Sequence, residues 1–237
     1  MHLNQVDIVQ ARFPTRQHHP FNLAVLRKSR TLYFETPVTF FAGENGTGKS
    51  TLLKAIAMRS GLNIWQGERR MRPAVNPFEG QLFRALDLKW ADERVQGTYF
   101  DAQVFRSFAS ILDDWAANDP GVLAYFGGKS LLRQSHGQSL MSFFHARFQI
   151  KGLYVLDEPE TALSPKSQLE LLSLLKDAGD AGHAQFIIAT HSPILLACPA
   201  SRIYGFDRAP IETVPYEQTD HYRIYKRFLE DRGRFLR

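Results

Sequence analysis

The segment Val38-Thr39-Phe40-Phe41-Ala42-Gly43-Glu44-Asn45-Gly46-Thr47-Gly48-Lys49-Ser50 joins an apolar run to a glycine-rich turn that ends in a lysine and a serine. Residues 43–50 match the phosphate-binding P-loop pattern G-x-x-x-x-G-K-[ST]. Glycines let backbone N–H groups converge on phosphate oxygens, and the helix that follows adds the positive end of its dipole. We expect Lys49 to neutralise the β- and γ-phosphates of a nucleotide and the Ser50 hydroxyl to ligate Mg²⁺. The segment therefore predicts a P-loop between a buried strand and a helix.

A second apolar run ends in two carboxylates, in Leu153-Tyr154-Val155-Leu156-Asp157-Glu158-Pro159. Parallel strands present their carboxyl ends at one edge of a sheet, so both carboxylates are expected beside the P-loop. Asp157 is then predicted to hold Mg²⁺, directly or through water. Glu158 is predicted to act as the general base on the water that attacks the γ-phosphate.

A histidine follows a third apolar run, in Ile187-Ile188-Ala189-Thr190-His191-Ser192-Pro193. A lone histidine is more often a structural residue than a catalytic one. Here His191 follows a strand and lies downstream of Asp157-Glu158, where its side chain can reach the same crevice. We therefore predict that it contacts the γ-phosphate.

The order of these segments predicts an α/β protein, because continuous apolar runs separated by a helical segment are typical of parallel strands buried on both faces. Strands are expected at 6–9, 22–26, 31–34, 38–42, 153–156 and 186–189, helices within 48–57, 105–117 and 167–178, and an exposed loop at about 60–76.

Composition bounds the class of protein. The 237 residues are 44% apolar and 22% charged with a net charge of +5, which is typical of a globular protein and permits, without requiring, an anionic partner. The single cysteine, Cys198, excludes an internal disulfide and favours a reducing compartment, predicted to be the cytoplasm. No apolar segment follows Met1, and the longest uncharged stretch, 181–201, is too polar to span a bilayer, so neither a signal peptide nor a transmembrane segment is expected.

The P-loop, Asp-Glu-Pro and Thr-His-Ser in this order resemble the ATP-binding-cassette (ABC) ATPase superfamily. More narrowly, the chain resembles the small AAA_21-like ATPases related to SMC-like and OLD-type ATPases. The matching segments are 37–50, 134–139, 156–165 and 185–193, and the segments 221–223 and 227–230 are similar to the C-terminal pattern of this group.

The resemblance implies a P-loop NTPase fold of ABC-ATPase type, with a mixed-sheet core and a small helical lobe. We expect one domain over 1–237, with a nucleotide core at about 1–60 and 140–215, a helical lobe at about 104–140 and a helical tail at about 216–237. The implied ligands are ATP and Mg²⁺, and the implied reaction is hydrolysis of ATP to ADP and phosphate. The implied nucleotide contacts are Gly43, Glu44, Asn45, Gly46, Thr47, Gly48, Lys49, Ser50, Thr51, Gln103, Ser135, Gly137 and Gln138, the catalytic residues are Lys49, Glu158 and His191, and the metal ligands are Ser50, Asp157 and Gln103.

Ser135-His136-Gly137-Gln138 takes its meaning from the resemblance. The matching Ser-Gly-Gly-Gln of ABC ATPases opens a helix whose N-terminus contacts the γ-phosphate held by a second subunit, and a helix N-terminus with Ser and Gly suits an anion. Here His136 replaces the first glycine, as the small-ATPase group also has it. An ATP-dependent homodimer follows from this assignment.

Three further assignments are less specific. Gln103 is chosen as the glutamine-loop residue that senses Mg²⁺ and water, with Asp101 an almost equal candidate. Phe13 is a candidate to stack on adenine, although an apolar residue there is more often part of the core. Ser164 stands where the resemblance leads one to expect a D-loop aspartate, which leaves communication across a dimer through that residue without support.

The sequence is compatible with three functions. The first is an ATPase that dimerises around ATP and drives a separate effector, for example in DNA repair, mobile-element control or phage defence. The second is the ATP-binding subunit of a membrane transporter, against which the Ser-His-Gly-Gln and Leu-Ser-Pro departures argue. The third is a nucleotide-gated binding module, against which Glu158 argues because such a switch needs no base. Long SMC-type arms are excluded, since only about 30 residues separate Gln103 from Ser135.

The C-terminal segment from His221 to Arg237 is basic, with six Lys and Arg against Glu230 and Asp231. Its apolar residues recur at helical spacing (Tyr222, Tyr225, Phe228, Leu229). We expect a helix docked on the core with its charges in water, while the alternative is a phosphate-binding surface for nucleic acid.

Overall fold

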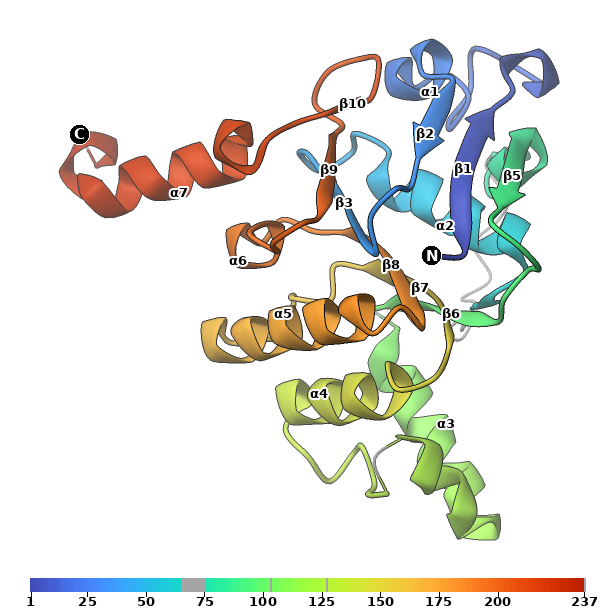
Figure 1. Cartoon of the computed structure of the whole chain (residues 1–237), viewed down its shortest axis with the longest axis vertical. Coiled ribbons are helices and arrows are strands. Elements are labelled where there is room, and N and C mark those ends of the chain that lie inside the picture. Colours follow the sequence, from blue (N-terminus) through green and yellow to red (C-terminus); the bar gives the residue numbers. More distant parts are fainter. Residues whose placement is uncertain (65–75, 103, 127, 237) are drawn as a thin grey trace.

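A seven-stranded sheet forms the centre of the molecule (Figure 1). The computed structural model describes residues 1–64, 76–102, 104–126 and 128–236. The strands of this sheet are β3 (Val38–Ala42), β4 (Asn63–Ile64), β6 (Gly97–Asp101), β7 (Gly152–Asp157), β8 (Ala184–Ala189), β9 (Arg202–Gly205) and β10 (Glu212–Thr213). Their order is β10-β9-β3-β8-β7-β6-β4, and each neighbouring pair is parallel except β9 with β10.

A smaller antiparallel sheet covers one face of the large one. It consists of β1 (Leu3–Ile8), β2 (Thr31–Tyr33) and β5 (Leu86–Trp90) in the order β2-β1-β5. The helix α2 (Lys49–Ser60) lies between the two sheets, as Figure 1 shows, and its apolar side chains belong to one buried cluster with residues of both. The P-loop helix is thus held from two sides.

Helices cover the opposite face of the large sheet (Figure 1): α4 (His136–Arg147), α5 (Pro165–Asp180) and the short α6 (Pro193–Leu196). The alternation of strand side chains explains the two layers, because Phe40 of β3 packs into the cluster under α4 and α5 while Phe41 packs into the cluster around α2. The central strands are buried on both faces, as expected of a parallel sheet.

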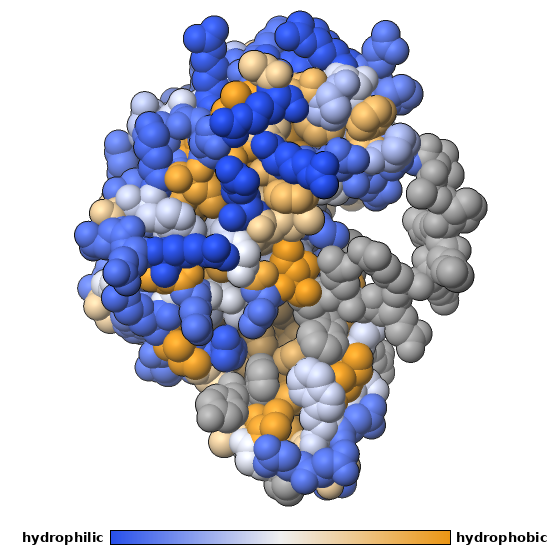
Figure 2. Space-filling model, turned by 90° about the vertical axis from the view of Figure 1, so that its right-hand side faces the viewer, coloured by the Kyte–Doolittle hydropathy of each residue, from blue (hydrophilic) through white to orange (hydrophobic). Residues whose placement is uncertain are grey.

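A helical lobe extends from this second layer. It is made of α3 (Phe105–Asn118) and the 3₁₀ segment Pro120–Phe126, and α3 forms the narrow lower end of the molecule in Figure 1. Phe105 and Phe143 pack edge to face at 5.5 Å between ring centroids and join the lobe to α4. On the face shown in Figure 2, hydrophobic residues gather between the more hydrophilic upper part and this lower end.

Most of the predicted elements are confirmed, including the parallel pairing of β7 with β8. The strand predicted at 22–26 is wrong, because the chain there forms the helix α1 (Ala24–Lys28). Val25 and Leu26 are both buried in the cluster around α2, and consecutive residues reach one core more readily from a helical turn than from a strand, whose side chains alternate. Most of the loop predicted at 60–76 lies outside the described residues.

The C-terminal helix α7 (Asp220–Glu230) forms as predicted, but of its four predicted apolar residues only Tyr222 is half-buried and packs on the body, against Tyr216, so the expected docking of the whole apolar face is wrong. No residue of α7 is buried, and Tyr225 and Leu229 are 53% and 77% exposed. Figure 1 shows α7 projecting from the body of the molecule. Helical spacing identifies an apolar face, and it carries no information on what covers that face. Within the described parts of the chain, none of the helices combines the length and apolarity that crossing a bilayer requires.

Candidate nucleotide site

Three neighbouring strands end at the same edge of the large sheet and carry the predicted site residues. β3 leads into the P-loop, β7 ends at Asp157, and β8 leads to His191. Phe41 and Asp157 both pair in register with Ala189, so the ends of the three strands are level. Chain segments more than a hundred residues apart therefore meet at one place.

The P-loop has the backbone that its glycines allow. Gly43, Gly46 and Gly48 have φ of 150°, 79° and 103°, in the range that side-chain-bearing residues rarely adopt. At Gly48, an added Cβ would also come within 2.9 Å of the Leu23 side chain. Gly48 is the N-cap residue that precedes α2, and no side chain caps this helix, so its first N–H groups remain available at the loop.

Lys49 lies folded inside the loop. It is 4% exposed, and its Nζ donates to the carbonyl oxygens of Gly43 at 2.6 Å and Glu44 at 2.8 Å. Burial lowers the pKa of Lys49, while the nearby carboxylates, Glu158 foremost, act in the opposite direction. An ammonium held this way can exchange its two carbonyl acceptors for phosphate oxygens.

Asp157 is the buried carboxylate of the site. The Ser50 hydroxyl donates to its Oδ1 at 2.8 Å, and the Tyr99 hydroxyl donates to its Oδ2 at 3.1 Å. Burial raises the pKa of Asp157 to about 6, against the effect of the Ser50 hydrogen bond. The pairing of Asp101 with Asp157 across β6 and β7 places Tyr99 near the carboxylate. Sequence reasoning missed Tyr99, because only this register reveals it.

Glu158 and His191 face each other beside Asp157. Glu158 has φ of +47°, uncommon for a residue with a side chain and frequent at functional sites, and its N–H donates to the Ala189 carbonyl at 2.9 Å. Its Oε1 lies 3.6 Å from Nε2 of His191. That Nε2 is buried and has no hydrogen-bond partner among the described residues.

Two further carboxylates support the site, and neither was predicted. Glu160 accepts the backbone N–H of His191 at 2.7 Å through its Oε1, and burial raises its pKa. Asp207, which follows β9, accepts the backbone N–H of Glu44 at 2.7 Å. Glu160 could have been suspected from its place after Asp157-Glu158-Pro159, whereas Asp207 carries no signal in the sequence.

The geometry suits a hard cation next to phosphate. Ser50 and Asp157 offer two oxygens 2.8 Å apart, and Mg²⁺ typically uses few protein oxygens besides phosphate and water. A cavity of about 250 Å³ adjoins them, lined by Ser50, Thr51, Lys54, Tyr99, Asp101, Asp157 and Glu158. The donor set therefore fits the magnesium predicted from the sequence. Of the two glutamine-loop candidates, Asp101 lines this cavity, and Gln103 lies outside the described residues.

The predicted phosphate contact at Ser135 lies elsewhere, at the start of α4. The Ser135 Oγ accepts the N–H of Gln138 at 3.3 Å, and the Gln138 Oε1 accepts the N–H of Ser135 at 3.1 Å, which forms a capping box. An added Cβ at Gly137 would lie 3.1 Å from the carbonyl of Ala162, so α4 approaches the segment after the acidic pair closely. These residues are not among those that line the P-loop cavity.

The structure shows local roles for two other predicted residues. Ser164 caps α5 by accepting the N–H of Ser167 at 3.2 Å. Phe13 packs edge to face on Phe21 at 4.9 Å between ring centroids, and adenine stacking by Phe13 stays a prediction. Asn45 and Glu44 are exposed on the P-loop, and the Thr47 hydroxyl donates to the Glu44 carbonyl at 2.9 Å.

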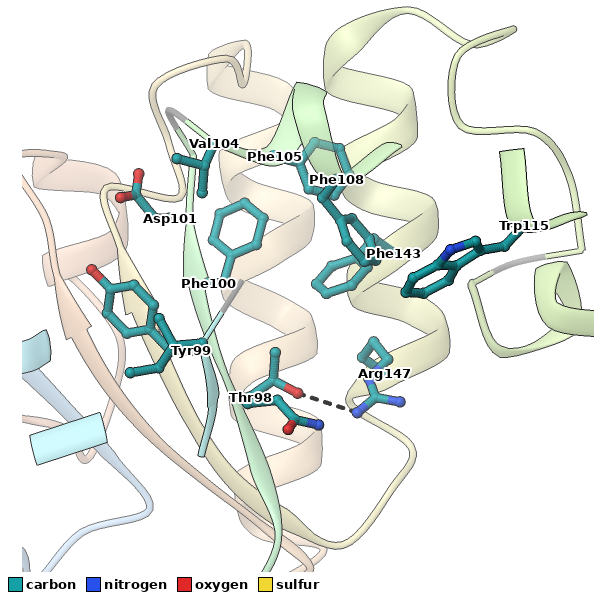
Figure 3. A pocket seen from close by; sticks show the side chains of 12 residues that line it. Thr98, Tyr99, Phe100, Asp101, Val104, Phe105, Phe108, Trp115, Phe143 and Arg147 are labelled. Carbon is teal, nitrogen blue, oxygen red and sulfur yellow. Dashed lines mark hydrogen bonds between the residues drawn. The ribbon is translucent and has the colours of Figure 1, made fainter. Parts of the chain in front are cut away.

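A larger, aromatic pocket of about 480 Å³ lies on the other side of β6 (Figure 3). Phe100, Phe105, Phe108 and Phe143 line it, and Arg147 donates to the Thr98 hydroxyl at 3.2 Å. Tyr99 and Asp101 line both this pocket and the P-loop cavity, so β6 separates the two.

Two family models match parts of the chain. AAA_21, an AAA domain whose description names the AbiEii toxin and a type IV toxin–antitoxin system, matches residues 130–197, and the AAA domain AAA_23 matches residues 19–60. No curated protein matches the chain.

Solved structures share the fold. The SMC head domain from Thermotoga maritima has a TM-score of 0.50 and 16% identity, over 91% of this chain and 99% of that one. cbiO1 from Clostridium perfringens, part of the ABC transporter complex cbiONQ, has 0.50 and 18%, over 84% and 86%. An ATP-binding subunit of an ABC transporter has 0.51 and 16%, over 95% and 93%.

Two separate stretches of the chain thus match AAA-domain family models, and the chain shares the fold of SMC-head and ABC ATPase domains, which together support an ABC-type, SMC-like AAA ATPase. The resemblance seen in the sequence is confirmed, and so is the α/β P-loop NTPase fold.

Proposed function

We propose that the chain binds ATP with Mg²⁺, hydrolyses it to ADP and phosphate, and dimerises around the nucleotide to drive a separate effector. The observation that carries the proposal is the convergence of Lys49, Ser50, Asp157, Glu158 and His191 at one sheet edge. These residues lie at or just after the ends of three neighbouring strands. They supply a cation, two metal-binding oxygens, a base and a neutral hydrogen-bond donor, which is the set of groups that phosphoryl transfer to water requires.

Each residue has a task that follows from its contacts. Lys49 leaves the carbonyls of Gly43 and Glu44 and donates to phosphate. Ser50 and Asp157 hold Mg²⁺, which neutralises charge on the phosphates. Glu158, whose side chain is about 30% exposed, accepts the proton of the attacking water, and His191 donates from Nε2 to the γ-phosphate.

A second copy would complete the site. In one chain, Ser135 and Gly137 lie apart from the residues that line the P-loop cavity. A symmetric dimer in which each α4 N-terminus meets the nucleotide of the other copy would use each face twice. Ligand bound at such an interface favours association, so dimerisation would depend on ATP. We keep the division predicted from the sequence into a nucleotide core, a helical lobe and a helical tail. The effector would bind to the lobe or to the tail.

The test is the oligomeric state of Glu158→Gln with saturating ATP and Mg²⁺, by light scattering after size exclusion. We expect a dimer, because the amide cannot accept the proton and ATP persists. Adding Ser135→Arg should return the protein to monomer while nucleotide affinity changes little, and wild-type ATPase activity per molecule should fall on dilution. A Glu158→Gln protein that binds ATP and stays monomeric would overturn the dimer, and a wild-type protein without Mg²⁺-dependent ATPase activity would overturn the enzyme.

A further inference from the structure

The first turn of α7 reaches the nucleotide site, although the rest of the helix is exposed. Nε2 of His221 lies 3.2 Å from Nδ1 of His191, and the two rings are tilted by 51° with their centroids 5.3 Å apart. His221 is the second residue of α7, so a helix that projects into solvent in Figure 1 starts in contact with the site.

The base of α7 is anchored firmly enough to hold His221 in place. Thr219 caps the helix by accepting the N–H of Tyr222 at 3.3 Å, and only 4% of it is exposed. The Tyr216 hydroxyl donates to the Pro193 carbonyl at 2.9 Å, two residues after His191. The rings of Tyr216 and Tyr222 pack edge to face at 4.8 Å. The place of His221 is therefore set by α6 and by the turn before α7.

The contact between the two imidazoles requires a proton on one of the two facing nitrogens. Burial lowers the pKa of both His191 and His221, so the neutral forms are favoured. A neutral imidazole carries one N–H and one bare nitrogen. The pair therefore has two arrangements, in which either His221 or His191 is the donor.

The groups around Nε2 of His191 determine which of the two histidines is the donor. If His191 donated from Nδ1, its buried Nε2 would present a lone pair to the Glu158 carboxylate, 3.6 Å away. If His221 donates from Nε2, the proton of His191 sits on Nε2 and faces that carboxylate. The second arrangement replaces a repulsive contact by an attractive one.

We propose that His221 is a positioning residue, which donates from its Nε2 to Nδ1 of His191 and so holds His191 as the tautomer with its proton on Nε2. The consequence for catalysis rests on the proposed function, because that proton is the one His191 offers to the γ-phosphate. The tautomer itself is a property of the nucleotide-free protein.

The tautomer can be read directly from long-range ¹H–¹⁵N spectra of the full chain with ¹⁵N-labelled histidine. We expect a protonated Nε2 and a bare Nδ1 for His191 in the wild type. In His221→Phe, which keeps a ring but removes the donor, this single tautomer should be lost. In His221→Gln, whose amide can donate, it should be kept. A wild-type His191 protonated on Nδ1, or an unchanged tautomer in His221→Phe, would overturn the proposal.

Kinetics test the catalytic consequence. His221→Phe should lower kcat for ATP by about 10-fold, the scale seen when the partner that orients a ligating histidine is removed, with KM little changed. His221→Gln should restore most of the rate. In a His191→Ala background, His221→Phe should have no further effect, because His221 acts through His191. An unchanged kcat in His221→Phe, or an equal loss in the His191→Ala background, would overturn the positioning role.

The matched control is Arg223→Gln, an exposed change on the same helix that should leave kcat and the tautomer unchanged. The two proposals fail separately. A wild-type protein without ATPase activity would overturn the proposed function, while the spectra of the nucleotide-free chain would still decide the arrangement of the two histidines.

Discussion

The N-termini of α2 and α4 were both predicted to bind phosphate, and the structure builds them in opposite ways. At α2, Gly48 precedes the helix with a left-handed backbone, no side chain caps the first turn, and Lys49 lies buried beneath the loop. At α4, Ser135 and Gln138 satisfy each other's backbone N–H groups in a capping box at the surface. One terminus is open to an anion and the other is closed by its own side chains.

This difference in capping distinguishes a phosphate site that one chain can form from a surface that needs a second copy of the chain to complete it. An open helix end inside a ring of charged residues can bind phosphate within one chain. A self-capped helix end at the surface is stable without a ligand. The Ser135 hydroxyl would donate to a phosphate only when a second copy of the chain brings its bound nucleotide to this helix end. This is the physical reason why we assign ATP binding to the α2 side and dimer closure to the α4 side.

Lys49→Ala, at the open N-terminus of α2, should have the largest effect on activity. We expect ATPase activity to fall by at least about 10²-fold, because the loop loses the charge that neutralises the phosphates. Arg59→Ala, an exposed change at the other end of α2, serves as the control. A variant that lacks Lys49 and hydrolyses ATP at the wild-type rate would show that α2 is not the phosphate-binding terminus.

The charge buried beside α2 should be visible in stability. The pKa of Asp157 is raised from 3.8 to about 6, which means that folding favours the neutral carboxyl. The stabilisation by the neutral form is fully present below pH 4 and is lost as the pH rises through 6, because the buried carboxylate then carries its charge. At pH 8, Asp157→Asn should stabilise the nucleotide-free protein by up to about 3 kcal/mol relative to wild type, and the gain should vanish near pH 4. Urea unfolding at both values measures this, with the exposed Asp177→Asn of α5 as control. A gain that does not depend on pH would exclude burial of the charge as its cause.

The closed terminus should show the smaller energy of a helix cap. Ser135→Ala is expected to lower the free energy of unfolding by about 1 kcal/mol, because the N–H of Gln138 loses its acceptor. Ser164→Ala removes the corresponding acceptor at the start of α5 and should cost a similar amount. No loss at Ser135, with a normal loss at Ser164, would mean that the capping box is absent in solution.

The basic C-terminal segment is a third candidate for phosphate binding, and we expect substitutions there to have the smallest effect on stability. Arg227→Ala changes an exposed residue of α7, and the free energy of unfolding should stay within about 0.5 kcal/mol of wild type. Titration with duplex DNA at several salt concentrations tests the alternative. An affinity that falls steeply with salt and weakens in the variant would support the phosphate-binding interpretation of this segment.

Much of the site could be predicted because its parts are local in sequence. The glycine pattern of 43–50 requires a specific backbone, and apolar runs that end in Asp157-Glu158 and in Thr190-His191 indicate buried strands with polar ends. The parallel arrangement of these strands then brings the ends together without further information. At 22–26, in contrast, a short apolar run was compatible with strand and helix, and the position of the core relative to Val25 and Leu26 decided between them.

The sequence by itself determined the P-loop, the acidic pair, the histidine and the strand–helix order, because each rests on neighbouring residues or on a regular period. Only the tertiary structure decided which other side chains contact the P-loop, the acidic pair and the histidine. Tyr99 reaches Asp157 through the register of β6 and β7, Asp207 reaches the P-loop from the end of β9, and His221 reaches His191 from an exposed helix. These are single side chains contributed by distant segments, and no spacing along the chain reveals a contact that exists only after the strands have paired and the helices have packed.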